Sequence, residues 1–227
     1  MPTSVVNINV HGIGSAAACP RPLDPGEEHI WVSIEQFEQV LDAAMGRDDV
    51  RITFDDGNTS DVEIGLPRLL ERGLKAHFFI LAGELGAPGR LDRDDVRELL
   101  GAGMAVGSHG WAHRDWRRLT DAEAEQEMVD APRVIGALTG EPVTTVAIPF
   151  GSYDRIVLNR LRKAGMRLVY SSDGGQAHTG QWLQARNSVN KDTDAEWIRN
   201  TLAGRATPAV QARRMVARRV KKLRGAP

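Results

Sequence analysis

Residues 50–57 read Val-Arg-Ile-Thr-Phe-Asp-Asp-Gly, a predicted strand that ends in two adjacent carboxylates and a glycine. Glycine permits the sharp turn that follows the strand. Three other polar segments also come directly after predicted strands: Ser-His-Gly-Trp-Ala-His at 108–113, Pro-Phe-Gly-Ser-Tyr-Asp at 149–154 and Ser-Asp-Gly-Gly at 172–175. The chain therefore repeats one plan, in which unusual polar residues stand at the carboxyl end of a strand.

Short apolar runs alternate with helical patterns along the chain. The predicted strands lie at 5–10, 50–54, 75–81, 104–107, 144–148, 167–171 and 185–189. The predicted helices lie at about 33–45, 62–72, 92–102, 120–138, 155–164, from 193 onward and 208–224, with Ser33, Thr120 and Thr193 as caps. This alternation implies parallel strands joined by helical crossovers. We predict an α/β fold, a closed or nearly closed (β/α) barrel with about seven parallel strands and its active site at their carboxyl ends.

The composition is that of an ordinary soluble globular protein. The chain has 227 residues, 41% of them hydrophobic and 26% charged, and we predict one domain over 1–227. The formal net charge of −1 argues against nucleic acid as a partner. No run approaches the roughly 18 apolar residues of a membrane span, and the first residues do not resemble a signal peptide. The single cysteine, Cys19, fits a reducing compartment, so we expect a cytoplasmic protein.

Two of the polar segments carry residues suited to a metal site. Asp55 and Asp56 point in different directions at a strand end, so one can bind a metal while the other takes a proton. His109 and His113 are four residues apart, and on a helical turn both imidazoles would lie on one face. Taken separately, the segments could also be a solvated turn and two surface histidines. Together, two imidazoles and one carboxylate leave a coordination position open for water and substrate.

In the order and spacing of its motifs, the chain resembles the polysaccharide deacetylases, the carbohydrate esterases that share the nodulation-deacetylase homology domain. That family has a Thr-Phe-Asp-Asp-Gly segment, a histidine pair and a proline–aromatic–glycine segment on a distorted (β/α) barrel. Here these segments stand at 53–57, 109–113 and 147–151. The resemblance implies a metal-dependent hydrolase that removes the acetyl group from an N-acetylated sugar or glycan.

The resemblance also implies roles for the matching residues. Asp56, His109 and His113 would hold one divalent metal ion, zinc by preference, with cobalt, nickel and manganese as alternatives. Asp55 would be the general base that deprotonates the metal-activated water. The backbone N–H of Phe150 would stabilise the oxyanion of the tetrahedral intermediate.

The later motifs depart from the family's pattern. Ala147 stands where the family has an arginine that tethers the base, and Arg186 could approach Asp55 from a neighbouring strand instead. The fourth motif keeps only Asp173, which could orient a metal ligand or a substrate hydroxyl. Its tryptophan is missing, and Trp111, Trp116 or Trp182 could replace it beside the acetyl group. The predicted substrate-binding residues are therefore Tyr153, which could line the groove, and Asp173, Trp111 and Arg186.

The general acid of the family, a histidine in its fifth motif, is also missing, since residues 186–190 contain none. His11 ends the first strand, and in a closed barrel the first and last strands are neighbours, so His11 could reach the same corner. His178, in the loop after the sixth strand, is an alternative, and a proton from metal-bound water or solvent is another. We favour His11 because a strand end places a side chain more rigidly than a glycine-rich loop.

The predicted C-terminal helix, 208–224, is strongly basic. Seven Lys and Arg residues and no acid occur between 213 and 224. Apolar residues recur there at helical spacing, and we favour packing of this face on the domain. The alternative is peripheral contact with an anionic membrane surface.

Two other functions stay open. The departures in motifs three to five favour a carbohydrate-binding pseudoenzyme, whereas the intact Asp55 disfavours it, because a binding protein needs no base beside a metal. The same scaffold could also hydrolyse another carbon–nitrogen bond, such as that of a cyclic amide.

Overall fold

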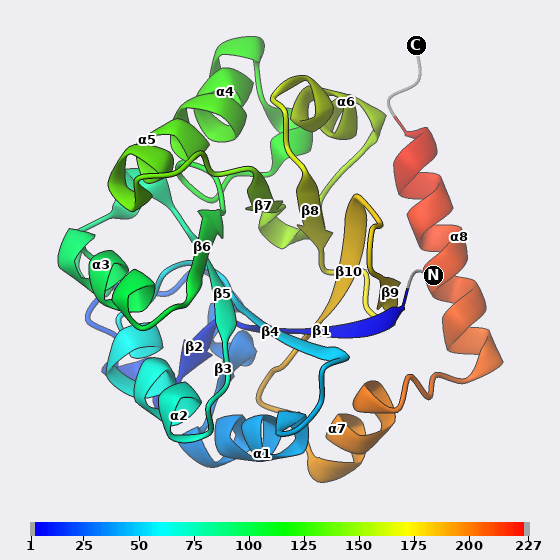
Figure 1. Ribbon diagram of the computed structural model, residues 1–227. Helices are drawn as coiled ribbons and strands as arrows, with labels where there is room; N and C mark the ends of the chain where they lie inside the picture. Colours follow the sequence, from blue (N-terminus) through cyan, green and yellow to red (C-terminus); the bar gives the residue numbers. More distant parts are fainter. Residues whose placement is uncertain (1–2, 225–227) are drawn as a thin grey trace.

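The computed structural model describes residues 3–224, except the side chain of Pro208, and at its centre lies a closed barrel of parallel strands (Figure 1). Around the barrel the order is β10, β8, β7, β6, β5, β4 and β1, and β10 pairs with β1 to close it. Their bounds are β1 (Ser4–Val10), β4 (Val50–Phe54), β5 (Ala76–Ile80), β6 (Ala105–Ser108), β7 (Thr145–Ala147), β8 (Leu168–Ser171) and β10 (Leu183–Ser188). The predicted barrel is thus confirmed. The predicted domain ends, 1 and 227, lie outside the described residues, so the single domain stays a prediction.

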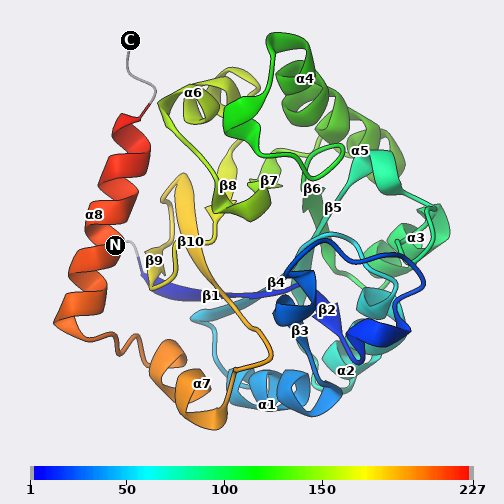
Figure 2. The same ribbon diagram turned by 180° about the vertical axis from the view of Figure 1, so that it is seen from behind.

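Helices surround the barrel, as Figures 1 and 2 show from opposite sides. The α-helices are α1 (Ile34–Ala44), α2 (Leu66–Glu71), α3 (Arg93–Gly101), α4 (Asp121–Glu125), α5 (Ala131–Thr139), α6 (Arg155–Lys163), α7 (Ala195–Leu202) and α8 (Pro208–Leu223). The shorter 3-10 turns are η1 (Ala16–Ala18), η2 (Glu27–Ile30), η4 (Ala82–Glu84), η5 (Trp116–Arg118) and η7 (Pro149–Gly151), and the π-helical turns are η3 (Asp61–Gly65) and η6 (Gln126–Asp130).

Two of the predicted helices contain a π-helical turn. The one predicted at 62–72 consists of η3 and α2, and the one at 120–138 consists of α4, η6 and α5. In each, a proline, Pro67 or Pro132, stands near the start of the α-helix that follows the π turn. Proline has no N–H to donate and its ring clashes with the carbonyl four residues back, so the backbone widens before it.

Two of the three predicted helix caps are confirmed. The hydroxyls of Ser33 and Thr120 each accept the backbone N–H three residues further on. The cap predicted at Thr193 is wrong. The Thr193 hydroxyl accepts the N–H of Asn190, and Asp194 caps α7 through its carboxylate.

Three two-residue strands were not predicted from the sequence. Gly12–Ile13 (β2) and Trp31–Val32 (β3) pair in parallel beside the barrel. The segment that joins β2 to β3 contains η1 and η2. In Figure 2 it is the blue chain that connects the strands labelled β2 and β3. Ala177–His178 (β9) pairs antiparallel with β1, with His178 opposite Ser4. Strands this short carry too little alternation to be recognised from sequence.

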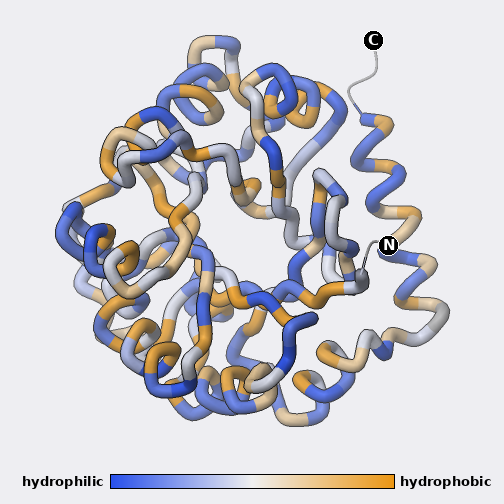
Figure 3. Tube along the Cα trace, viewed as in Figure 1, coloured by the Kyte–Doolittle hydropathy of each residue, from blue (hydrophilic) through white to orange (hydrophobic). Residues whose placement is uncertain are grey.

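The alternation in β1 divides the strand between two environments. Val6, Ile8 and Val10 are buried in the main apolar core, which lies between the barrel and its helices. Asn7 and Asn9 are also fully buried, and they hydrogen-bond to side chains of β10 and β4. The face of β1 toward the inside of the barrel is therefore polar, while its outer face is apolar. Figure 3 shows that hydrophobic and hydrophilic residues are interspersed along the whole chain.

Helix α8 differs from the other helices in how it contacts the protein. Its apolar side chains are largely exposed: 68% for Met215, 62% for Val216 and 63% for Leu223. The favoured prediction that this apolar face packs on the domain is therefore wrong. The helix is held instead by polar contacts, among them Lys221 Nζ with Asp173 Oδ1 at 2.7 Å. Within the part of the chain that the structure describes, no helix is both long and apolar enough to cross a bilayer.

Candidate active site

The predicted ligands and base meet at the carboxyl-end rim of the barrel. There they line a pocket of about 350 Å³ together with His11 and Phe150. The segment between β2 and β3 forms another part of its wall, through residues 24–27 and Ile30. This placement follows from the parallel strands, whose carboxyl ends all lie at one end of the barrel.

Asp56, His109 and His113 form a compact cluster of ligand atoms. One ligand atom from each lies within 4.8 Å of the others. The Nε2 atoms of His109 and His113 lie 3.3 Å and 3.5 Å from Asp56 Oδ1. The three atoms thus face a common point, as the ligands of one ion must.

The chemistry of this cluster fits a divalent metal ion. Oδ1 of Asp56 is buried, and within residues 3–224 it has no hydrogen-bond partner. A buried carboxylate oxygen without a partner is costly unless a cation compensates it. Nδ1 of His109 lies 2.9 Å from the carbonyl oxygen of Ala147, so its proton belongs there and the Nε2 lone pair faces the cluster. Asp56, His109 and His113 would therefore hold the ion.

The backbone that presents the two histidines is a loop, so the helical turn predicted for them is wrong. Gly110 has a φ of 92°, outside the helical range, and a Cβ there would lie 2.3 Å from Oε2 of Glu127. The buried Glu127 carboxylate accepts the N–H groups of the two residues after Gly110, at 2.7 and 3.1 Å. Glu127 thus takes the place of helical hydrogen bonds and fixes the path from His109 to His113.

Positive φ angles mark this site in a second way. Among non-glycine residues of the described chain, only Asp56 (75°), His113 (51°) and Phe150 (58°) have them. Such angles are unfavourable for residues with a Cβ and persist where the surroundings enforce them. All three residues line the pocket, and the rings of His113 and Phe150 are 4.3 Å apart. Backbone strain is therefore concentrated at the candidate site.

Asp55 is held by two partners inside the barrel. Arg186 donates from Nη1 to Oδ1 at 2.7 Å and from Nη2 to Oδ2 at 2.5 Å, and Asn9 Nδ2 donates to Oδ2 at 2.9 Å. Burial alone would raise the pKa of Asp55, but the charges of Arg186 and His109 outweigh it and lower the pKa to about 2. Asp55 is therefore an oriented carboxylate, and Arg186 approaches it from β10 as the sequence suggested.

The two candidate acids lie at opposite ends of β1. His11 lines the pocket, with Nε2 3.9 Å from Asp55 Oδ2, whereas His178 stands beside Ser4 at the amino end. The seven residues from Ser4 to Val10 span roughly 20 Å of strand, so His178 is too far away to act. Burial lowers the pKa of His11 despite the nearby carboxylates, so His11 is a neutral imidazole near pH 7.

None of the four predicted substrate-binding residues lies in the pocket wall. Tyr153 is 1% exposed, and its hydroxyl donates to Asp173 at 2.7 Å. Asp173 also binds Lys221 of α8, so its carboxylate is committed to the structure. The indole of Trp111 packs against Gly83, and Arg186 is fully buried against Asp55. Tyr153, Asp173 and Arg186 thus support the site from behind, because protein partners already occupy their polar groups.

Sequence reasoning missed Asn9 and Glu127, which orient the base and the histidine loop. It also missed Arg90, whose Nη1 donates to the Asp56 carbonyl at 3.2 Å and to Asn58 Oδ1 at 2.9 Å. For Asn9 a signal existed, because a polar residue facing the inside of a barrel strand needs a partner. Glu127 and Arg90 stand in exposed-looking helix and loop sequences that give no such signal.

Comparison with known proteins identifies relatives of this chain. The family model described as Polysaccharide deacetylase matches residues 42–169, more than half of the chain. The YxkH protein of Bacillus subtilis is 27% identical over 140 residues, which cover 62% of this chain and 50% of YxkH. The peptidoglycan-N-acetylglucosamine deacetylase PgdA of Listeria monocytogenes is 30% identical over 114 residues, covering 49% of this chain and 23% of PgdA. The chain spans half or less of the length of the curated relatives it matches.

Solved structures share the fold. The Streptococcus pyogenes deacetylase PplD, determined in complex with acetate, superposes with a TM-score of 0.75 at 19% identity, covering 89% of this chain and 99% of PplD. IcaB from Ammonifex degensii gives a TM-score of 0.71 at 20% identity, covering 89% of this chain and 97% of IcaB. At these identities the likeness is one of fold, and it agrees with the barrel of Figure 1.

Proposed function

Because the chain belongs to the polysaccharide deacetylase family, we propose that it hydrolyses the N-acetyl group of an acetylated sugar or glycan. One divalent metal ion, zinc by preference, would be held by Asp56, His109 and His113. The observation that carries the proposal is the pairing of this ligand cluster with Asp55, a buried carboxylate that Arg186 and Asn9 hold in one orientation.

The residues divide the reaction between them. When bound, the metal would polarise the acetyl carbonyl and lower the pKa of water at the site. Asp55 takes the proton of the attacking water, and Arg186 keeps both oxygens of Asp55 in place for it. The N–H of Phe150, in its left-handed turn at the pocket wall, donates to the oxyanion.

The leaving amine needs a proton, and His11 is the residue placed to give it. Nε2 of His11 lies 3.9 Å from Asp55 Oδ2, and its Nδ1 is buried and without a hydrogen-bond partner in the described structure. A neutral His11 can accept at Nε2 the proton that Asp55 takes from water. The protonated imidazole then donates this proton to the nitrogen of the leaving amine and becomes neutral again. The alternative donor is solvent water at the pocket mouth.

The arrangement favours an enzyme over a carbohydrate-binding pseudoenzyme. A binding protein gains nothing from a second carboxylate beside the ligand cluster, and burying Asp55 with Arg186 costs desolvation energy that only partly returns. The pocket, about 350 Å³, lies at the small end for ligand sites, which suits one sugar residue at a time. An amide of another kind, such as a cyclic one, would have to fit the same space.

The test is acetate release from N-acetylglucosamine oligomers. We expect release with added zinc, its loss on chelation and its return when zinc is restored. Oligomer binding without acetate release, in protein shown to contain zinc, would identify a pseudoenzyme. Release of ammonia or ring-opened product from cyclic amides, with none from acetylated glycans, would indicate the other hydrolase.

A further inference from the structure

A second pocket, larger than the active-site pocket, lies between α7, α8 and the segment after β8. It measures about 760 Å³, and five basic side chains line it: Arg205, Arg214, Arg218, Arg219 and Lys222. Among the described residues of its wall there is no Asp or Glu. We infer that this basic pocket binds a phosphate-bearing anion.

The charge of Arg214 is not compensated within the protein. Its side chain is half-buried and packs closely on Gly174. A Cβ added to Gly174 would lie only 3.0 Å from Arg214 Nη2. In the part of the chain that the structure describes, Arg214 has neither a salt bridge nor a hydrogen bond to an acceptor. Burial, and next the charge of Arg218, lower the pKa of Arg214. A bound anion would remove this repulsion.

Arg218 stands one helical turn after Arg214, on the same face of α8. It donates to the carbonyl of Gly174, and its Nε lies 3.9 Å from Asp173 Oδ2. Asp173 is already bonded to Lys221 at 2.7 Å, so one negative carboxylate faces two positive side chains, Lys221 and Arg218. The helix therefore brings more positive charge to this wall than the protein neutralises.

Neutral groups in the wall suit the same ligand. The pocket reaches Thr207, which caps α8, and Val210 in the first turn of α8, a 16-residue helix whose amino end carries partial positive charge. Asn200 and Gln176 add side-chain amides that can donate to oxygen. Guanidinium groups in pairs match the several oxygens of a phosphate better than they match one carboxylate, which favours phosphate over a sugar acid.

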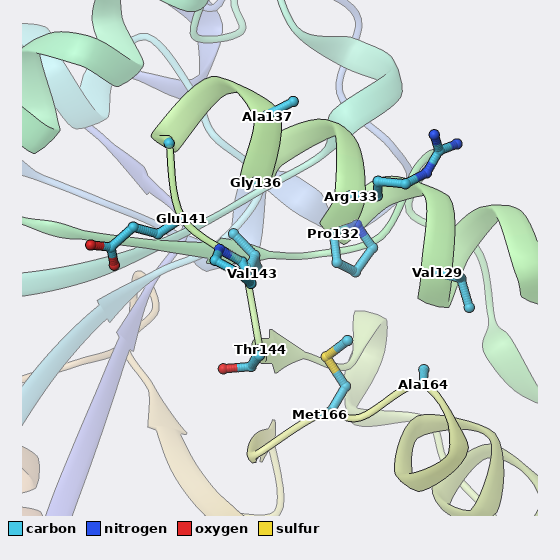
Figure 4. Close-up of a pocket in the computed structure, with 12 residues that line it drawn as sticks. Val129, Pro132, Arg133, Gly136, Ala137, Glu141, Val143, Thr144, Ala164 and Met166 are labelled. Carbon is cyan, nitrogen blue, oxygen red and sulfur yellow. The ribbon is translucent and has the colours of Figure 1, made fainter.

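The pocket in Figure 4 shows that basic character is not general to the clefts of this protein. That pocket, about 570 Å³, lies by the end of α5 and the residues before β7 and β8. Its two charged side chains, Arg133 and Glu141, have opposite signs. It offers an anion no comparable attraction.

The phosphate could come from a soluble molecule or from the headgroup of a lipid. Exposed Met215 lines the basic pocket, and Val216 and Leu223 are exposed further along the same helix. An anionic membrane could bury these side chains while its headgroups enter the pocket. The segment after β8 contributes to both pockets, Ser172 to the active-site pocket and Gly175 and Gln176 to the basic pocket.

Calorimetric titration of the zinc-loaded protein with inorganic pyrophosphate tests the site, using the Arg214→Gln/Arg219→Gln variant. We expect binding to weaken at least about tenfold in this variant, because two charge-assisted contacts are lost. Arg218 is kept because it anchors α8. The control is Arg213→Gln/Arg224→Gln, which removes the same charge from exposed positions outside the pocket wall and should bind as wild type does. Circular dichroism confirms that α8 is retained.

Sedimentation with phosphatidylglycerol vesicles separates the two sources of phosphate. Binding of pyrophosphate alone supports a soluble ligand, and binding of both supports a lipid headgroup, provided that the pocket variant loses each. Failure to bind either probe would overturn the inference. Equal losses in the pocket and control variants would also overturn it, because they would report general charge rather than a site.

Discussion

The active-site pocket and the basic pocket hold their charges in different ways. In the first, Asp55 is fixed by Arg186 and Asn9, and His109 by a backbone carbonyl, all from the ends or interior of barrel strands. In the second, the charges come mainly from one helix, and its Arg214 has no acidic partner in the described chain. Fixed groups suit a reaction, whereas uncompensated charges suit binding. Substitutions should therefore separate turnover at one pocket from anion binding at the other.

The largest expected effect is that of Asp55→Asn, which removes the base but keeps the size of the side chain. We expect kcat for acetate release to fall about 10³-fold, because general base catalysis contributes that order of magnitude. Acetate release is the measurement, and Asp48→Asn, an exposed acid before β4, is the control. A fall of less than about threefold would make Asp55 a structural residue and remove the contrast.

Arg186→Lys tests whether orientation of the base matters apart from its charge. Lysine keeps the positive charge but loses the paired contact with both oxygens of Asp55, so we expect kcat to fall about 10²-fold with KM little changed. Steady-state kinetics measure both constants. Arg167→Lys, at an exposed position before β8, should have no effect. An unchanged kcat in Arg186→Lys would show that Asp55 needs no tether.

His11→Ala should have a smaller effect, since solvent water can replace a lost acid. We expect kcat to fall about tenfold and the acidic limb of the pH–rate profile to change, because His11 must start as a neutral imidazole and is protonated at low pH. His178→Ala is the matched control, because that histidine lies at the other end of β1. A wild-type profile in His11→Ala would exclude His11 from proton transfer.

His77→Gln should change stability and leave turnover unaltered. His77 lies inside the barrel, stacked on Phe79, with Nε2 3.0 Å from Thr145 Oγ1. Burial lowers its pKa from 6.5 to about 4. Between those values the unfolded chain takes up a proton that the folded protein does not, so stability falls as pH drops from 6.5 to 4.

The shift corresponds to roughly 3 kcal/mol of unfolding free energy across that window. Urea unfolding of wild type and His77→Gln at pH 7 and pH 4 measures it. The variant should lose less stability between the two pH values than wild type does. If wild type and His77→Gln lost the same unfolding free energy between pH 7 and pH 4, His77 would not be the group that titrates.

The sequence was sufficient for the barrel and for the residues of the candidate ligand cluster, because the alternation of strands with helices and each ligand motif are local patterns. Strand-end segments such as 53–57 carry their chemistry in adjacent residues, and alternation with helices implies parallel strands. The pairing of Arg186 with Asp55 joins residues 131 positions apart, so sequence offered it only as one possibility among several. The left-handed turn at His113 depends on Glu127, which no local pattern connects to it.

The decisive measurement of the ligand assignment is the zinc content of the purified protein. Elemental analysis compares wild type, His113→Ala, Asp55→Asn and the surface control His29→Ala after dialysis against equal zinc. We expect about one zinc per chain in wild type, Asp55→Asn and His29→Ala, and much less in His113→Ala, because only His113→Ala removes a ligand. Equal zinc in all four proteins would contradict the assignment of Asp56, His109 and His113.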